Sequence, residues 1–406
     1  MSNLSLPSSL RSLSKKHELE PGPINGKDPP PKKGSRRWLN RDGIFLTALL
    51  IVFVTAIVVV ITRVQTTPPA SNLLVHDPAA IYSNGHFYAF GGADIGPGVP
   101  YYKSHGSSMN GPWNMVGQVL PNGSKAHEAN EQFKKPWAPA VVEKNGTYYV
   151  FYATTIPSTR KSTIGVAASV NLDAPDTWID YGAIIYTGEG PNSDQYPFNV
   201  TNAIDASVLI DPKSGTPILQ YGSYWDGIFQ LPLSSDLRSL KDPTPPFSNS
   251  HIVYNGATAI KNGSFHLGAH PIEGSALAYH APYYYVYYAH GACCGLAKVV
   301  NTIPPADVYQ IRIGRSETLT GPFVDKNGTD LLQGGGTTFL ASHGNVFAPG
   351  GPGVLTAPDG SDIFYYHYMD RNGDLQDKHA LLGWNTLVYG DDGWPSLSKP
   401  DPEGSG

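Results

Sequence analysis

The chain has 406 residues and a net charge of −5, which allows one large domain or two ordinary ones. Residues 1–41 carry nine Lys or Arg and three Asp or Glu, a net charge of +6, and the charges of Asp42 and Arg63 cancel. Residues 64–406 therefore have a net charge of −11. An acidic main domain argues against nucleic acid as a partner, because that binding depends on basic patches. Two adjacent cysteines, Cys293 and Cys294, exclude a disulfide-rich scaffold.

Residues 1–42 are polar and rich in proline, without hydrophobic periodicity. Such a segment cannot bury enough apolar surface to offset the entropy lost on ordering. We therefore expect a disordered cytoplasmic tail.

Residues 43–63 predict one transmembrane signal-anchor helix. The run at 44–61 contains no charged residue, and a helix of ~20 apolar residues crosses a bilayer. Five basic residues lie just before the run and Arg63 alone just after it, so the positive-inside rule leaves the N-terminus in the cytoplasm. We expect a single-pass type II membrane protein with an extracellular main domain. The alternative is a secretory signal that is removed, whose apolar region usually has ~7–15 residues.

Residues 64–71 predict a short stalk, and residues 72–400 predict one extracellular domain. Five sequons for N-glycosylation follow the predicted span, whereas a sixth, at Asn3, precedes it and would face the cytosol in this topology. The five begin at Asn122, Asn145, Asn199, Asn262 and Asn327. Each triplet alone is weak evidence, but together they fit surface turns of a glycoprotein.

Five similar segments recur within residues 72–400. They begin at His76, Trp137, Ile204, Ile272 and Gly351. Each has an extended run, a turn with Gly or Pro and a second run rich in aromatic residues, which predicts a β-hairpin. Their spacing suits four-stranded blades, so we expect an all-β fold, a five-bladed β-propeller. The alternative is a β-sandwich with accidental similarity between the hairpins.

The first strand of a propeller blade lines the central axis. We interpret Asp77, Ala138, Asp205, Glu273 and Gly353 as the equivalent residues of the five repeats. Three of these are acids, and carboxylates that converge on one pocket repel one another and lose solvation. A purely structural reason for such a cluster is hard to find. One carboxylic acid and one carboxylate are the pair that glycoside cleavage needs, with a third carboxylate to tune the acid.

The order of several motifs resembles glycoside hydrolase family 43, and within it the endo-1,5-α-L-arabinanases. The matching runs are His76-Asp77-Pro78, Trp137-Ala138-Pro139, Asn202-Ala203-Ile204-Asp205, Glu273-Gly274, and residues 222–227, 293–295, 365–370 and 391–395. The resemblance covers residues 72–396. Ala206 and Pro352 depart from the usual pattern, which leaves the geometry of the sugar subsites open.

The resemblance implies an inverting enzyme with Asp77 as general base, Asp205 as modulator of the acid's pKa and Glu273 as general acid. It also implies substrate-binding residues, which are Trp137, Asn202, Ser223 and Trp225. Ordinary blade packing is the alternative for the two tryptophans. His367 would lie beside a structural calcium ion or a water cluster under the catalytic centre, or else be a core histidine bonded to a carbonyl group. The cysteine pair would shape a loop, either as a vicinal disulfide or as buried thiols.

We therefore expect inverting endo-hydrolysis of α-1,5-arabinofuranosyl linkages in arabinan, a pectin side chain, with no cofactor required for the chemistry. An exo-acting α-L-arabinofuranosidase or β-xylosidase is the alternative on the same scaffold. A non-catalytic sugar-binding propeller is a further alternative, but a binding protein has no reason to keep all three carboxylates.

Overall fold

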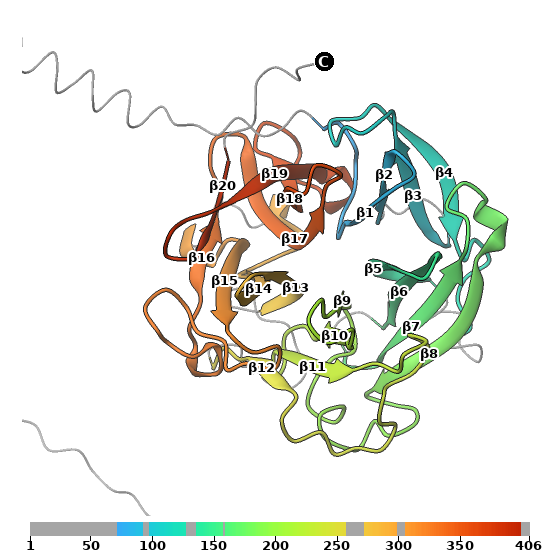
Figure 1. Cartoon of the computed structure of the whole chain (residues 1–406), viewed down its shortest axis with the longest axis vertical. Helices are drawn as coiled ribbons and strands as arrows, with labels where there is room; N and C mark the ends of the chain where they lie inside the picture. Colours follow the sequence, from blue (N-terminus) through green and yellow to red (C-terminus); the bar gives the residue numbers. More distant parts are fainter. Residues whose placement is uncertain are drawn as a thin grey trace, which may run out of the picture. The chain divides into compact units, whose positions relative to one another are not determined.

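The computed structural model describes residues 71–91, 97–126, 135–156, 159–256, 272–298 and 305–398, which all fall in one compact unit, Gln65–Gly406. These residues form five four-stranded antiparallel sheets arranged around a common axis, as Figure 1 shows. The fold is the five-bladed β-propeller that the repeats predict.

Each blade is a meander in which consecutive strands pair. Blade one contains β1 (Ala79–Ser83), β2 (His86–Phe90), β3 (Val99–Ser104) and β4 (Trp113–Val119). Blade two contains β5 (Trp137–Lys144), β6 (Thr147–Thr155), β7 (Ser162–Ser169) and β8 (Ile179–Thr187). Blade three contains β9 (Ser207–Ile210), β10 (Pro217–Tyr221), β11 (Ile228–Pro232) and β12 (His251–Val253). Blade four contains β13 (Ile272–His280), β14 (Tyr283–His290), β15 (Gln310–Ser316) and β16 (Thr337–Leu340). Blade five contains β17 (Val346–Thr356), β18 (Asp362–Asp370), β19 (Leu381–Tyr389) and β20 (Pro395–Leu397).

The first strand of every blade lies nearest the axis and the fourth lies at the periphery (Figure 1). The described helices are short 3-10 turns between strands. They are Pro175–Thr177, Leu296–Lys298, Pro305–Asp307, Leu331–Gln333 and Asp377–His379. None of the helices in the described ranges is long and apolar enough to span a bilayer. The predicted tail (1–42), membrane span (43–63) and most of the stalk (64–71) lie outside those ranges, as do residues 399 and 400.

Aromatic residues of the second strands fill the spaces within and between blades. In blade two Tyr152 pairs with Gly165 across β6 and β7, and in blade five Tyr366 pairs with Gly383 across β18 and β19. A Cβ atom on either glycine would come within 2.4 Å of the tyrosine ring. The aromatic ring therefore covers a position that has no side chain, and this pairing needs glycine on the third strand.

Strand pairing corrects two of the predicted equivalences. Trp137 pairs with Ala153, and Glu273 pairs with Ala289 in the same place of blade four. Glu273 therefore corresponds to Trp137, one residue before the position of Ala138. Gly353 is also misplaced, because it pairs with Tyr365 two residues beyond the equivalent position.

The position shared by all five blades is a residue with positive φ at the start of the inner strand. Its members are Asp77 (φ 48°), Ala138 (43°), Asp205 (56°), Gly274 (53°) and Gly351 (55°). Asp tolerates this left-handed conformation better than most residues, and Gly tolerates it best. Blade four thus has glycine at the shared position and presents its carboxylate from the residue before it.

Candidate active site

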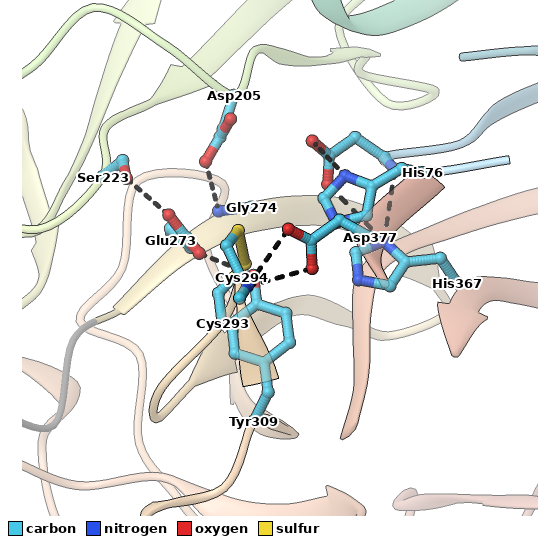
Figure 2. Close-up of a disulfide and its surroundings, with 12 residues drawn as sticks. His76, Asp205, Ser223, Glu273, Gly274, Cys293, Cys294, Tyr309, His367 and Asp377 are labelled. Atoms are coloured by element: carbon cyan, nitrogen blue, oxygen red, sulfur yellow. Dashed lines mark hydrogen bonds and ion pairs between the residues drawn. A yellow bond between two sulfur atoms is a disulfide. The ribbon is translucent and has the colours of Figure 1, made fainter. Parts of the chain in front are cut away.

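The three predicted acids meet at the inner ends of blades one, three and four. Asp77 lies just before β1, Asp205 just before β9 and Glu273 within β13. The charges of Asp77 and Glu273 both act on Asp205, and the charge of Asp77 acts on Glu273. Figure 2 shows Asp205 and Glu273 converging beside Gly274. The structure therefore brings the predicted trio together in one axial site.

Glu273 is 8% exposed and is held by two hydroxyl groups. Ser223 Oγ donates to Oε2 at 2.6 Å, and Tyr309 OH donates to Oε1 at 2.9 Å. Burial, helped by the charge on Asp77, raises the pKa of Glu273 to about 7. The two hydroxyl groups favour the ionised form, but their effect is smaller. At mildly acidic pH this side chain is a carboxylic acid that can give up a proton.

Asp205 accepts a hydrogen bond from the backbone N–H of Gly274, 3.1 Å from its Oδ2. That contact ties Asp205 to the residue next to Glu273. Burial, followed by the charges of Glu273 and Asp77, raises the pKa of Asp205 well above its ordinary value. Asp205 and Glu273 therefore oppose each other's ionisation, as two neighbouring buried carboxyl groups must.

Asp77 has a different environment from the other two acids. Its Oδ2 lies 3.1 Å from Nδ1 of His76, and its side chain is 23% exposed. Burial by itself would raise the pKa of Asp77, but the neighbouring His76 outweighs burial and lowers it to about 2. Burial likewise opposes the charge on His76, but the Asp77 carboxylate raises the pKa of His76 to about 9. Asp77 is thus an ionised carboxylate where Glu273 is still protonated.

His367 holds the backbone of Asp77 and packs against His76. Its ring is 1% exposed, stacks on His76 with 4.2 Å between ring centroids, and accepts the Asp77 N–H at Nδ1 over 3.1 Å. Burial and the charge on His76 lower the pKa of His367 to about 3. The ring is therefore neutral and anchors the backbone of Asp77.

The residues around His367 do not fit a calcium ion held by the protein. Calcium takes six to eight oxygen ligands, whereas the described cluster of possible ligands here contains His76, Asp77 and His367, with one carboxylate among them. His367 already uses Nδ1 for the Asp77 N–H.

The predicted substrate-binding residues have different surroundings. Ser223 is buried and points at Glu273, as Figure 2 shows, a partner that the sequence did not suggest. Asn202 is also buried, and its Oδ1 accepts a hydrogen bond from Ser162 Oγ at 2.6 Å. Trp137 is half-buried at the start of β5, in the position that Glu273 occupies in blade four. Trp225 is half-buried with φ 40°, in the same turn as Ser223.

Cys293 and Cys294 form a vicinal disulfide, one of the two states that the sequence left open. Both sulfur atoms lie within 4.8 Å of a His76 ring nitrogen. The following residue, Gly295, donates its N–H to both carboxylate oxygens of Asp377, at 3.2 and 3.1 Å. The pair therefore lies beside His76, in a loop held to blade five (Figure 2).

Two residues of the site had no role in the sequence interpretation. His76 stands next to Asp77 in the first motif, and that adjacency was the available signal. Tyr309 lies outside all five repeats, so no pattern pointed to it. Among the sequons, four asparagines are exposed, Asn122, Asn145, Asn199 and Asn327, whereas Asn262 lies outside the described residues.

Comparison with known proteins agrees with this geometry. A family model described as "Glycosyl hydrolases family 43" matches residues 66–395. "Probable arabinan endo-1,5-alpha-L-arabinosidase D" of Emericella nidulans is 41% identical over 340 residues, covering 83% of this chain and 84% of the relative. "Arabinan endo-1,5-alpha-L-arabinosidase B" of the same organism is 35% identical over 408 residues, covering 95% and 92%.

Two solved structures share the fold at TM-scores near 0.65. The α-L-arabinanase of Cellvibrio cellulosa complexed with arabinohexaose has a TM-score of 0.66 at 25% identity, covering 81% of this chain and 96% of that one. An exo-1,5-α-L-arabinanase from a bovine ruminal metagenomic library has a TM-score of 0.65 at 28% identity, covering 82% of this chain and all of that one.

Proposed function

We infer that this chain, which belongs to glycosyl hydrolase family 43, hydrolyses internal α-1,5-linked arabinofuranosyl bonds of arabinan. The observation that carries the inference is one axial site where an ionised carboxylate and a protonated carboxylic acid coexist. Burial raises the pKa of Glu273 to about 7, while the pKa of Asp77 is about 2. Groups with such separated pKa values are suited to act as acid and base in one reaction.

We propose that hydrolysis proceeds in one inverting step. Asp77 accepts a proton from water as the water oxygen attacks the anomeric carbon. Glu273 gives its proton to the glycosidic oxygen as the bond from that oxygen to the anomeric carbon breaks. The products are two shorter chains, and the new reducing end has the anomeric configuration opposite to that of the cleaved bond.

Asp205 would act on the acid rather than on the substrate. The charge of Glu273 helps to raise the pKa of Asp205, and because such coupling is mutual, a charge on Asp205 would oppose the ionisation of Glu273. The bond of Asp205 to the Gly274 N–H fixes the backbone next to the acid. We propose that both effects keep Glu273 protonated and aimed at the leaving oxygen.

Trp137 and Trp225 are proposed to contact the sugar, because aromatic faces suit the apolar C–H faces of sugar rings. We propose the same role for Asn202, whose amide is fixed by Ser162. Alanine at Trp137 should raise KM for arabinan more than it lowers kcat. An unchanged KM would assign this tryptophan to blade packing.

The test of the activity uses linear debranched arabinan, linear xylan and an aryl arabinofuranoside. Endo-cleavage predicts that viscosity of debranched arabinan falls long before much reducing sugar appears. Arabinose as the sole product from the first time point would identify an exo-acting enzyme. Binding of arabinan without any cleavage would identify a sugar-binding protein.

We also propose that residues 43–63 anchor the protein in a membrane with the propeller outside the cell. The uncharged run and the basic residues before it support this topology, and the four exposed sequon asparagines suit glycosylation. Protease added to intact cells should release the propeller, and glycosidase treatment should lower its mass. An unglycosylated protein recovered from the cytosol would exclude this topology.

A further inference from the structure

Tyr309 connects the two sides of the axial site. Its hydroxyl group donates to Oε1 of Glu273 at 2.9 Å. Its ring is 3% exposed and lies nearly parallel to that of His367, with 6.0 Å between centroids and 15° between planes. His367 in turn accepts the backbone N–H of Asp77. One side chain therefore contacts the proposed acid and the histidine that anchors the proposed base.

The backbone around Tyr309 is built to accept its ring. The N–H of Tyr309 donates to the carbonyl oxygen of Ala292 at 3.2 Å. A Cβ atom on Gly350 would lie 1.8 Å from Cε1 of the tyrosine. No side chain other than hydrogen fits at Gly350 while the ring stays in place, so a backbone hydrogen bond and close packing against Gly350 together fix the position of Tyr309.

The hydroxyl group of Tyr309 keeps its proton in this environment. Burial, then the charges of Glu273, Asp77 and Asp205, raises the pKa of Tyr309 well above its ordinary value. A hydroxyl group that stays protonated donates a stronger hydrogen bond to a carboxylate than to a neutral acid. The contact with Glu273 is thus strongest after Glu273 has lost its proton.

We propose that Tyr309 is a positioning residue that aims the carboxyl group of Glu273 and stabilises it once its proton has passed to the leaving oxygen. This assignment rests on the function proposed above. Ser223 holds the other oxygen of Glu273, so the two hydroxyl groups fix the plane of the carboxyl group. The Tyr309 ring also acts as a spacer between Glu273 and His367, and thereby between acid and base.

The test compares Tyr309→Phe with Tyr284→Phe. Tyr284 is a matched control because it is buried and its hydroxyl group donates to a carboxylate, Asp211, at 2.8 Å outside the axial site. Both variants lose one such bond and keep the ring. Tyr309→Phe should lower kcat on arabinan by about 10- to 100-fold, the range for a hydrogen bond to a charged group. Tyr284→Phe should leave kcat unchanged.

Three further readouts separate positioning from a merely structural role. The alkaline limb of kcat/KM should move to higher pH in Tyr309→Phe, because a bond that favours ionised Glu273 is gone. The loss of kcat should be smaller on an aryl arabino-oligosaccharide, whose good leaving group needs less protonation. In a Glu273→Gln background, Tyr309→Phe should have little further effect on kcat. An unmoved alkaline limb, or losses that simply add, would overturn the assignment.

A measurement without substrate keeps this assignment separate from the proposed function. The titration of Glu273 is followed by carbon NMR of labelled glutamate, with the signal identified by its absence in Glu273→Gln. In Tyr309→Phe the Glu273 signal should titrate at higher pH than in the unmodified protein. If the Glu273 titration shifts in this way but the unmodified protein does not cleave arabinan, the proposed function is rejected while the hydrogen-bonding role of Tyr309 stands. If the unmodified protein cleaves arabinan but the Glu273 titration is the same in Tyr309→Phe, the role of Tyr309 is rejected while the proposed function stands.

Discussion

Replacing Glu273 by glutamine should stabilise the folded protein at neutral and alkaline pH. The unfolded chain releases the Glu273 proton above its ordinary pKa of 4.5, whereas in the folded protein burial raises the pKa to about 7. Folding therefore becomes less favourable as pH rises through this window, and the loss is complete above about pH 7. Because one pKa unit corresponds to ~1.4 kcal/mol, the ionised carboxylate costs about 3 kcal/mol.

Glutamine removes this cost because it stays neutral and keeps the shape of the side chain. Its amide group can still bond to the hydroxyl groups of Ser223 and Tyr309, which both donate and accept. We expect Glu273→Gln to exceed the unmodified protein in unfolding free energy by about 3 kcal/mol at pH 8. At pH 4 the two proteins should have similar stability. A gain of this kind with a loss of activity is the usual trade-off at a catalytic group.

Urea-induced unfolding followed by tryptophan fluorescence measures the effect at both pH values. Glu317→Gln removes an exposed carboxylate and serves as the control, with no stabilisation expected at pH 8. Parallel pH dependence in Glu273→Gln and the unmodified protein would refute the reasoning, since it would mean that Glu273 has a similar pKa in the folded and unfolded states.

Three other outcomes follow from the same structure. The pH profile of kcat/KM on arabinan should fall about tenfold per pH unit above about pH 7, where Glu273 loses its proton; a flat profile up to pH 9 would contradict its role as acid. Asp77→Asn should lower kcat by ~10²–10⁴-fold, and a substrate with a good leaving group should not restore it. With the unmodified enzyme, proton NMR of the first product should show inversion of the anomeric configuration, and retention would exclude the mechanism. Gly383→Ala should destabilise the propeller by ~1–3 kcal/mol through its clash with Tyr366, measured by urea unfolding. Gly256→Ala, with ordinary contacts at 3.6 Å, should be near neutral.

The sequence was sufficient for the fold because the information on hairpins is local. Each repeat carries its own turn residues and its own aromatic strand, and neighbouring strands pair in chain order. Asp77 and Asp205 were also placed correctly, since both occupy the left-handed residue at the start of an inner strand. That conformation accepts Asp, so the acid and the backbone signal coincide in the sequence.

The register of Glu273 in its strand was not predictable from the local sequence. The sequence comparison placed it with the two aspartates, but strand pairing sets it one residue earlier, with Gly274 in the left-handed position. A bulge is a feature of how two strands pair, and one strand's sequence does not reveal on which residue it falls. The sequence thus predicted which blade contributes the third acid and misplaced its register.

Apart from His76, which is adjacent to Asp77 in the sequence, the surroundings of the acids were decided by tertiary structure. Tyr309 follows a loop between the repeats and reaches Glu273 across 36 residues of chain, while His367 reaches Asp77 across 290. The pKa values of Asp77 and Glu273 are separated because burial raises that of Glu273, whereas at Asp77 the charge on His76, which stacks on His367, outweighs burial. Residue type determined that acids were available, but only the packing of the blades determined which of them holds its proton, because solvation and neighbouring charge depend on distances in space.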